Sequence, residues 1–443
     1  MERAKLLEKT GGSAGNPSFI KRLLEPFPLF LLVSLTGTAL FFILLPFLGV
    51  HGMDWFVMEN NGDYESADYF LPILFSAAGK DAYSFGVDAC YSPLAYGLFY
   101  LFGSFTGLPS LLDAGEIGAM SYAEKIAMSF ELLVSPYQLL VYLLYLLAGL
   151  LPYLFALDEL GLRTGKRRLL AAAVLFSLPM LGGALERGNL TLYVAGFALL
   201  SAALREKESR IFRAAALLLI GIAAGMKFYP AVLGLLYLKE KRFREAVILI
   251  VLGLFFVFAP FAFFGGLDGV RGLLENLSAL SSEVSYYGRI QFFQGIVSVF
   301  GISGRMAAAL SLLFGGGLVL LCLLTKSRVR TYTFLAALMA MFPPNAYRYT
   351  LLFFLLPLFF WIRDEGDKRS KVNTVRAVLY GCIFTIPSIP GLASGFHLNL
   401  GVYTLTCAEL FVYVSAWGLL FFEAAGALRE AAKTAQNPAK CSQ

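Results

Sequence analysis

The segment over residues 51–92 carries seven carboxylates between two apolar runs: Asp54, Glu59, Asp63, Glu65, Asp68, Asp81 and Asp88. Carboxylates beside hydrocarbon are costly unless they are solvated or used. A carboxylate held at that boundary can act as a general base towards a hydroxyl group, because poor solvation makes it hold a proton more tightly. Asp54 lies closest to the preceding apolar run and is the first candidate for this base. An interfacial aspartate beside the Trp55 anchor fits the sequence equally well.

A lysine occurs inside a second apolar segment, over residues 211–238. This segment has basic residues on both flanks, and it is too long for one crossing and too short for two. The pattern predicts two half-helices that meet at GMKFYP, residues 225–230, with Lys227 at the break. A lysine at a helix centre costs roughly 2.5 to 3.5 kcal/mol, so we expect Lys227 to face a polar cavity or an anion. The alternative is a side chain that reaches the membrane surface.

The motif ERGN, residues 186–189, lies between two apolar runs and delivers Glu186, Arg187 and Asn189 to one helix end. The guanidinium of Arg187 is suited to a phosphate or a carboxylate. The alternative is a solvated loop in which Glu186 and Arg187 neutralise each other.

The motif PPNAYRY, residues 343–349, has a similar form. Its prolines end one helix, and Asn345, Tyr347, Arg348 and Tyr349 open the next. Aromatic rings beside hydrogen-bonding groups suit a sugar, and Arg348 adds a possible anion contact. An aromatic belt at the membrane surface explains the tyrosines equally well.

The composition requires membrane helices to position these groups. With 58% hydrophobic and 15% charged residues, the chain is not a soluble globular domain. Long apolar runs predict an all-α polytopic membrane protein with about ten to twelve membrane segments, rather than a barrel. These runs include 27–50, 136–157, 245–264 and 402–422.

Basic clusters between the apolar runs predict which side is cytoplasmic. We expect one integral membrane domain over residues 1–443, with cytoplasmic tails at 1–25 and 424–443 and external loops at 51–92 and 265–290. Residues 68–79 of the first loop predict a short helix at the membrane surface. The topology of residues 93–157 stays open, because 109–135 is too charged to span easily.

Metal and nucleic-acid chemistry have little support in the sequence. The five cysteines show no CxxC spacing, and there are only two histidines, so no metal site is predicted. The acidic loop leaves a divalent cation open as a cofactor. The net charge of +6 comes from clusters typical of cytoplasmic loops, so nucleic acid is not an expected partner.

Four segments together resemble the GT-C class of membrane glycosyltransferases, and within it glycosyltransferase family 87. They are HGMDWF at 51–56 with its acidic loop, YSPLAYGLFYLF at 91–102, ERGNLTLYVAGFALL at 186–200 followed by GMKFYP, and PPNAYRYTLLFFLLP at 343–357. The resemblance implies a GT-C-like fold with a large first external loop. It also implies a hexosyltransferase of the bacterial cytoplasmic membrane that moves a mannose-like sugar, with inversion, from a polyprenyl-phosphate carrier to a lipid or glycan acceptor outside.

The resemblance also assigns roles to the candidate residues. The base falls to Asp54, with Asp63 or Asp68 as fallbacks. Lys227 would face the donor phosphate, with Arg187 and Arg348 as further cations, although Arg187 stands where relatives often carry glutamine. Ser92 departs from the family's YPP turn. Residues expected to contact the substrates are Tyr91, Glu186, Asn189, Tyr229, Asn345 and Tyr347.

Two other functions fit part of the pattern. A transporter or flippase of lipid-linked sugars also uses broken helices with charges at their ends, but the sequence has no visible inverted repeat. A polysaccharide polymerase would share the lipid-linked substrates. The sequence does not identify the sugar, the acceptor or the oligomeric state.

Overall fold

The computed structural model describes residues 23–436 of the chain, apart from 45–66, 87–88, most of 108–134, 163, 178, 186, 283–290, 344–347, 386–396 and 401–402. Helices dominate this part of the chain, which confirms the predicted all-α fold. The single sheet within it is a hairpin of β1 (His397–Leu400) and β2 (Tyr403–Thr406), which pair antiparallel.

The α-helices, in chain order, are α3 (Pro26–Leu44), α4 (Ala67–Ala77), α5 (Pro93–Thr106), α9 (Pro136–Glu159), α10 (Thr164–Leu175), α11 (Thr191–Leu204), α12 (Arg210–Met226), α13 (Gly234–Lys239), α14 (Phe243–Phe258), α15 (Gly266–Ser282), α16 (Phe293–Val299), α17 (Gly304–Leu324), α18 (Arg328–Ala340), α19 (Leu355–Asp364), α20 (Lys371–Ile383) and α22 (Cys407–Gln436). Between some of them, within the described residues, lie four short 3-10 helices and one π-helix. The 3-10 helices are η3 (Gly79–Asp81), η6 (Tyr229–Leu233), η7 (Ala259–Ala262) and η8 (Arg348–Phe354), and the π-helix is η5 (Met180–Leu185).

Four helices of the described chain are long and apolar enough to cross a membrane: α9, α14 together with η7, α17, and Phe411–Gln436 of α22. Their outward faces are apolar. Ile250 of α14 is 61% exposed and Leu313 of α17 is 72% exposed. Such faces are stable against lipid and not against water, so the protein is a membrane protein. The described residues do not test the predicted total of about ten to twelve segments.

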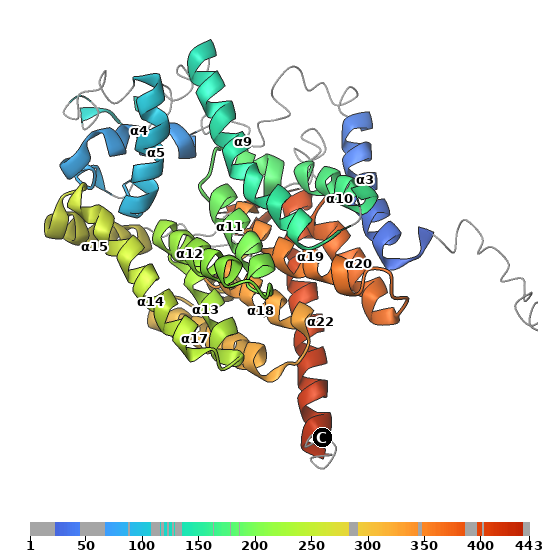
Figure 1. Ribbon diagram of the computed structural model, residues 1–443. Coiled ribbons are helices and arrows are strands. Elements are labelled where there is room, and N and C mark those ends of the chain that lie inside the picture. The colour runs from blue at the N-terminus through green and yellow to red at the C-terminus, as the bar shows by residue number, and fades with distance from the viewer. Residues whose placement is uncertain are drawn as a thin grey trace, which may run out of the picture.

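The core lies where α11, α18, α19 and η8 meet. Nearly every side chain of α18 and α19 is buried, including the large ring of Trp361. Helices α9 and α12 pack on α11, α14 packs on α12, and both α3 and α22 pack on α20 (Figure 1). The buried helices are thus surrounded by helices that present apolar faces outward.

Residues 211–238 form two helical pieces, as their pattern predicts. Helix α12 ends at Met226, Lys227 has an extended backbone with φ of −142°, and η6 begins at Tyr229. Pro230 is tolerated in the first turn of η6, where no intrahelical N–H bond is needed. The break falls inside GMKFYP, which confirms the predicted position of the half-helices.

Other segments differ in detail from their expected form. The helix expected at 68–79 is α4, but the rings of Tyr69, Phe70 and Phe75 are buried in the protein rather than spread at its surface. Tyr69 packs on Tyr142 of α9, with ring centroids 5.0 Å apart. The expected loop at 265–290 contains helix α15, and the expected tail from residue 424 continues α22 as far as Gln436.

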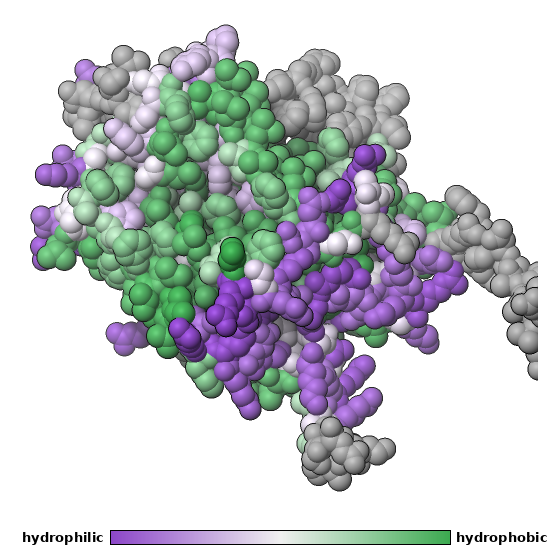
Figure 2. Space-filling model, viewed as in Figure 1, coloured by the Kyte–Doolittle hydropathy of each residue, from purple (hydrophilic) through white to green (hydrophobic). Residues whose placement is uncertain are grey.

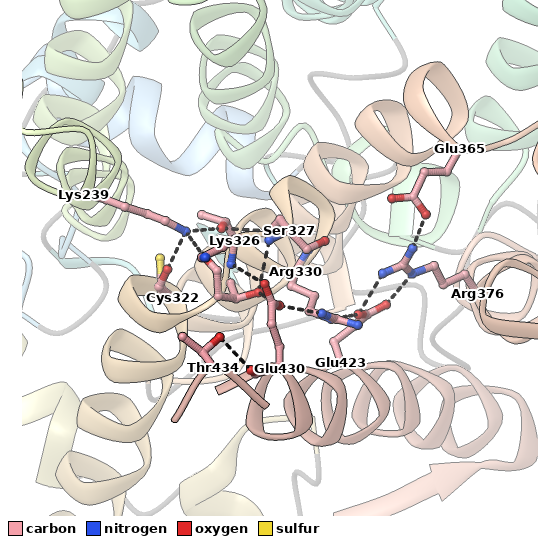
Figure 3. A network of polar contacts seen from close by, with 12 residues as sticks. Lys239, Cys322, Lys326, Ser327, Arg330, Glu365, Arg376, Glu423, Glu430 and Thr434 are labelled. Carbon is pink, nitrogen blue, oxygen red and sulfur yellow. Dashed lines mark hydrogen bonds and ion pairs between the residues drawn. The ribbon is translucent and has the colours of Figure 1, made fainter. Parts of the chain in front are cut away.

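Hydrophilic residues gather at one end of the molecule, in the lower part of the view, while apolar residues cover much of the rest (Figure 2). At this end a buried carboxylate joins three helices (Figure 3). Glu423 of α22 is 0% exposed and accepts from Arg376 Nε of α20 at 2.5 Å and from Arg330 Nε of α18 at 3.2 Å. Arg376 also donates to Glu365, at 2.5 Å. The network fixes α18, α20 and α22 against one another.

Candidate active site

The candidate site forms where α4 begins, α11 begins and α12 ends. These places bring together Asp68 in the first turn of α4, Arg187 and Asn189 before α11, and Lys227 after α12. Helices α11 and α12 follow each other in the chain and pack antiparallel, so the start of α11 lies beside the end of α12. The fold therefore joins motifs that are far apart in the sequence.

The turn before α11 is shaped by local sequence. Gly188 has a φ of +64°, and a Cβ there would lie 2.7 Å from atoms of Tyr142 and Tyr69, so only glycine fits. Asn189 accepts a hydrogen bond from the N–H of Thr191 through Oδ1, at 2.9 Å, and so satisfies one of the free donors at the helix start. The turn thereby directs the Asn189 amide and the Arg187 guanidinium towards α4.

Asp68 is held by two partners in a forked arrangement. Arg187 donates to it from Nε at 2.7 Å and from Nη2 at 3.1 Å, and Asn189 Nδ2 donates at 2.8 Å. Burial raises the pKa of Asp68, but the charge and hydrogen bonds of Arg187 outweigh burial and hold the pKa below its usual value. Asp68 is therefore an ionised carboxylate in this arrangement.

Lys227 lies next to this pair, close enough to feel the charge of Asp68, but its own hydrogen-bond partners are neutral. Its Nζ donates to Asn189 Oδ1 at 3.1 Å and to Thr191 Oγ1 at 2.8 Å. Its ammonium also lies 5.6 Å from the ring centre of Tyr91 and 5.1 Å from that of Tyr349. No carboxylate of the described residues forms an ion pair with Lys227. A cation in such surroundings is suited to an incoming anion.

Two tyrosines complete the wall around the lysine. The hydroxyl of Tyr91 accepts from Asn189 Nδ2 at 3.3 Å, and the hydroxyl of Tyr229 lies 3.4 Å from Thr191 Oγ1. Tyr91 is positioned by the next residue, because Ser92 caps α5 and also donates from Oγ to the carbonyl of Met226 at 2.9 Å. Ser92 thus ties the start of α5 to the end of α12.

An apolar groove of about 600 Å³ begins beside this cluster. Phe228, which follows Lys227 directly, lines it together with residues of α12, α13, α14 and α17. The lining is almost wholly hydrocarbon, with Val232, Leu254 and Val257 among its members. A charged head bound at Lys227 and a hydrocarbon tail in this groove would suit one amphipathic ligand.

The structure brings together six of the residues selected from the sequence: Asp68, Tyr91, Arg187, Asn189, Lys227 and Tyr229. Arg348 is buried at the start of η8, next to Tyr349, whose ring faces Lys227. The other selected residues lie outside the described residues: Asp54, Asp63, Glu186, Asn345 and Tyr347.

Sequence reasoning did not select Thr191, and it named Tyr349 in PPNAYRY without giving it a substrate contact. Thr191 stands two residues after Asn189, and nothing in ERGNLT distinguishes it from an ordinary hydroxyl at a helix start. Tyr349 follows Arg348 in PPNAYRY, a motif with two tyrosines of which Tyr347 was the expected contact. No metal-binding group of three His, Cys, Asp or Glu side chains occurs among the described residues, and most of the acidic loop lies outside them.

The sequence profile of glycosyltransferase family 87 matches residues 126–353 of the chain, which is just over half of its 443 residues. The matched segment contains Arg187, Asn189, Thr191 and Lys227. No curated protein and no solved structure matches the chain.

Proposed function

Because the chain belongs to glycosyltransferase family 87, we propose that it transfers a mannose-like hexose, with inversion, from a polyprenyl-phosphate carrier to a lipid or glycan acceptor on the external face of a bacterial cytoplasmic membrane. The observation that carries this proposal is the pair of neighbours Lys227, which belongs to the polar cluster, and Phe228, which lines the apolar groove. A lipid phosphate has the same two parts.

The donor phosphate would bind at Lys227 and Arg187. The cluster holds two cations, Lys227 and Arg187, against one carboxylate, Asp68, and the hydrogen-bond partners of Lys227, at 2.8 and 3.1 Å, are neutral, so an anion balances the excess positive charge. The polyprenyl chain would lie in the groove that begins at Phe228. Neither the groove nor the lysine alone favours a lipid phosphate over other ligands, but their adjacency does.

We assign the base to Asp68. It is the carboxylate that the described residues contribute to the cluster, whereas Asp54 and Asp63 lie outside them. In the transfer, an acceptor hydroxyl oxygen attacks the anomeric carbon, and the bond from that carbon to the phosphate oxygen breaks. The polyprenyl phosphate leaves with the electron pair, and the hydroxyl proton passes to the carboxylate.

Arg187 can bind either of two anions in this scheme, the Asp68 carboxylate or the donor phosphate. In the structure it neutralises Asp68, which makes the carboxylate a weak base. A donor phosphate competes for the same guanidinium, because both anions accept its forked N–H groups. Donor binding would thereby release Asp68 towards the acceptor and raise its basicity when it is needed.

The test is sugar transfer in proteoliposomes that contain the full chain, labelled polyprenyl-phosphate mannose and a lipid extract as acceptor. The variants are Asp68→Asn and Asp54→Asn, each checked for folding by its thermal midpoint. Transfer by the wild type and the Asp54 variant, with none by the Asp68 variant, supports the proposal. Loss in the Asp54 variant alone moves the base to Asp54. Movement of labelled donor across the bilayer without any new glycosidic bond supports a flippase and contradicts the transfer reaction.

A further inference from the structure

A second polar pocket lies at the far end of the helices that carry the candidate active site. Asn189 and Lys227 mark the start of α11 and the end of α12, whereas Arg205 and Arg213 lie at the end of α11 and the start of α12. At 1.5 Å per residue these helices are roughly 20 to 25 Å long, so the pocket is separate from the active site. The positive-inside rule places this basic end on the cytoplasmic side.

The pocket has a volume of about 510 Å³ and a strongly basic lining. Seven of its thirteen lining residues are basic and three are acidic: Arg205, Lys207, Arg213, Lys239, Arg242, Lys326 and Arg328 against Glu206, Glu208 and Glu240. The volume is in the range of small-molecule sites and accommodates a phosphate group with a glycerol or a sugar attached.

Arg205 is a buried residue of the pocket lining. The residue is only 5% exposed, and its guanidinium lies 5.4 Å from the ring centre of Tyr237. Its Nη2 pairs with Glu240 at 2.5 Å and its Nη1 donates to Tyr332 at 3.4 Å. Its Nε is buried without a hydrogen-bond partner among the described residues. A buried guanidinium with an unsatisfied N–H donor costs free energy unless a ligand accepts a hydrogen bond from that N–H.

Several of the other cations already have partners. Arg242 pairs with Glu245 and Glu240, and Arg328 pairs with Asp364 at 3.2 Å. Arg213 and Lys326 form no side-chain hydrogen bond or ion pair among the described residues, although the charge of Arg213 acts on Glu245, and Lys326 is exposed. Of the three lining carboxylates, Glu208 also forms no ion pair with a described residue, so the charge outside ion pairs is mainly cationic and comes from two separate elements, the start of α12 and the turn between α17 and α18.

We propose that this pocket binds a phosphate-bearing anion, through Arg205, Arg213 and Lys326. Guanidinium and ammonium groups on separate elements match the several oxygens of one phosphate. The phosphate belongs either to an anionic lipid headgroup or to a soluble molecule. The site is independent of the proposed transfer reaction, so the failure of either proposal leaves the other intact.

The experiment measures the thermal midpoint of the full-length protein in a neutral detergent at fixed ionic strength. The probes are dihexanoyl phosphatidylglycerol, inorganic pyrophosphate and, as the zwitterionic control, dihexanoyl phosphatidylcholine. We expect the midpoint to rise with at least one anionic probe and not with phosphatidylcholine. A rise with phosphatidylglycerol alone identifies a lipid headgroup site, and a rise with pyrophosphate identifies recognition of the phosphate group itself.

The double variant Arg213→Gln with Lys326→Gln removes two cations without breaking a side-chain hydrogen bond or ion pair of the described residues. A charge-assisted hydrogen bond contributes about 1.5 to 3 kcal/mol, so each loss should weaken binding by at least about tenfold. Arg244→Gln is the matched control, because Arg244 is exposed on α14 and lies outside the lining. The proposal is overturned if neither anionic probe raises the midpoint, if the double variant responds like the wild type, or if the control loses as much binding.

Discussion

The pairing of Asp68 with Arg187 gives the sharpest prediction, because changing both residues should restore stability but not activity. The variants are Asp68→Asn, Arg187→Gln and the combination of the two. Both side chains are largely buried, at 19% and 13% exposed, so either single change removes one charge from a buried ion pair. The double variant leaves two neutral groups.

Breaking a buried ion pair from one side costs about 3 to 5 kcal/mol, whereas replacing both partners is often close to neutral. We therefore expect each single variant to lose about 3 to 5 kcal/mol of unfolding free energy. The double variant should lose at least about 2 kcal/mol less than the two single losses combined. Transfer activity should be absent in every variant that lacks the carboxylate, since the loss of a general base costs about 10²- to 10⁴-fold in rate.

The assays are the unfolding free energy in mixed detergent micelles and sugar transfer in proteoliposomes at saturating donor. A double variant that recovers both stability and transfer would refute the assignment of the base, because neither charge would then be needed for chemistry. Additive stability losses would refute the ion pair itself. The pH dependence gives an independent check: the pKa of Asp68 is held below its usual value, so the stability from this pair is fully present above the ordinary aspartate range. This stability should be lost as the pH falls through the lowered pKa of Asp68 in the folded protein.

Three further variants test other parts of the structure. Lys227→Gln should raise the KM for the donor by about 10- to 100-fold, because a charge-assisted contact contributes about 1.5 to 3 kcal/mol, and should not lower the thermal midpoint; an unchanged KM removes Lys227 from the donor site. Gly253→Phe should raise the KM for a long-chain donor but not for a short-chain analogue, because Gly253 lines the groove and faces open space. The control is Gly317→Phe, since Gly317 also faces open space but lies outside the groove lining, and equal effects of the two variants on KM would exclude the groove as the binding site of the chain. Glu423→Gln should lower the unfolding free energy by about 3 to 5 kcal/mol in the micelle assay, because two arginines lose a buried counter-charge. A loss below about 1 kcal/mol, which is typical of a surface ion pair, would show that the network does not stabilise the protein.

Much of the cluster follows from sequence because it depends on helix order. The ERGN turn opens one helix and GMKFYP ends the next, and successive helices usually lie side by side in opposite directions. The order of the two motifs along the chain is therefore enough to place Arg187 near Lys227. The break at Lys227 was predictable as well, from a segment length that fits neither one crossing nor two.

The partner of Arg187 could not be predicted in the same way. Asp68 lies 119 residues away, and the acidic loop offers seven carboxylates. Distance from the preceding apolar run favoured Asp54, but the position of a carboxylate in space depends on how α4 folds back. That helix is apolar and aromatic, a composition that suits the membrane surface and the protein core equally, and its rings are in fact buried against α5 and α9.

The absence of a direct ion pair at Lys227, among the described residues, affects turnover. Under the proposed chemistry the donor is a phosphodiester with one negative charge, and the departing polyprenyl phosphate is a monoester that carries nearly two at neutral pH. A lysine that lacks an ion-pair partner among the described residues holds the second species more tightly than the first. Spent carrier should then be a competitive inhibitor, and its departure from the groove, rather than sugar transfer, should set the steady-state rate.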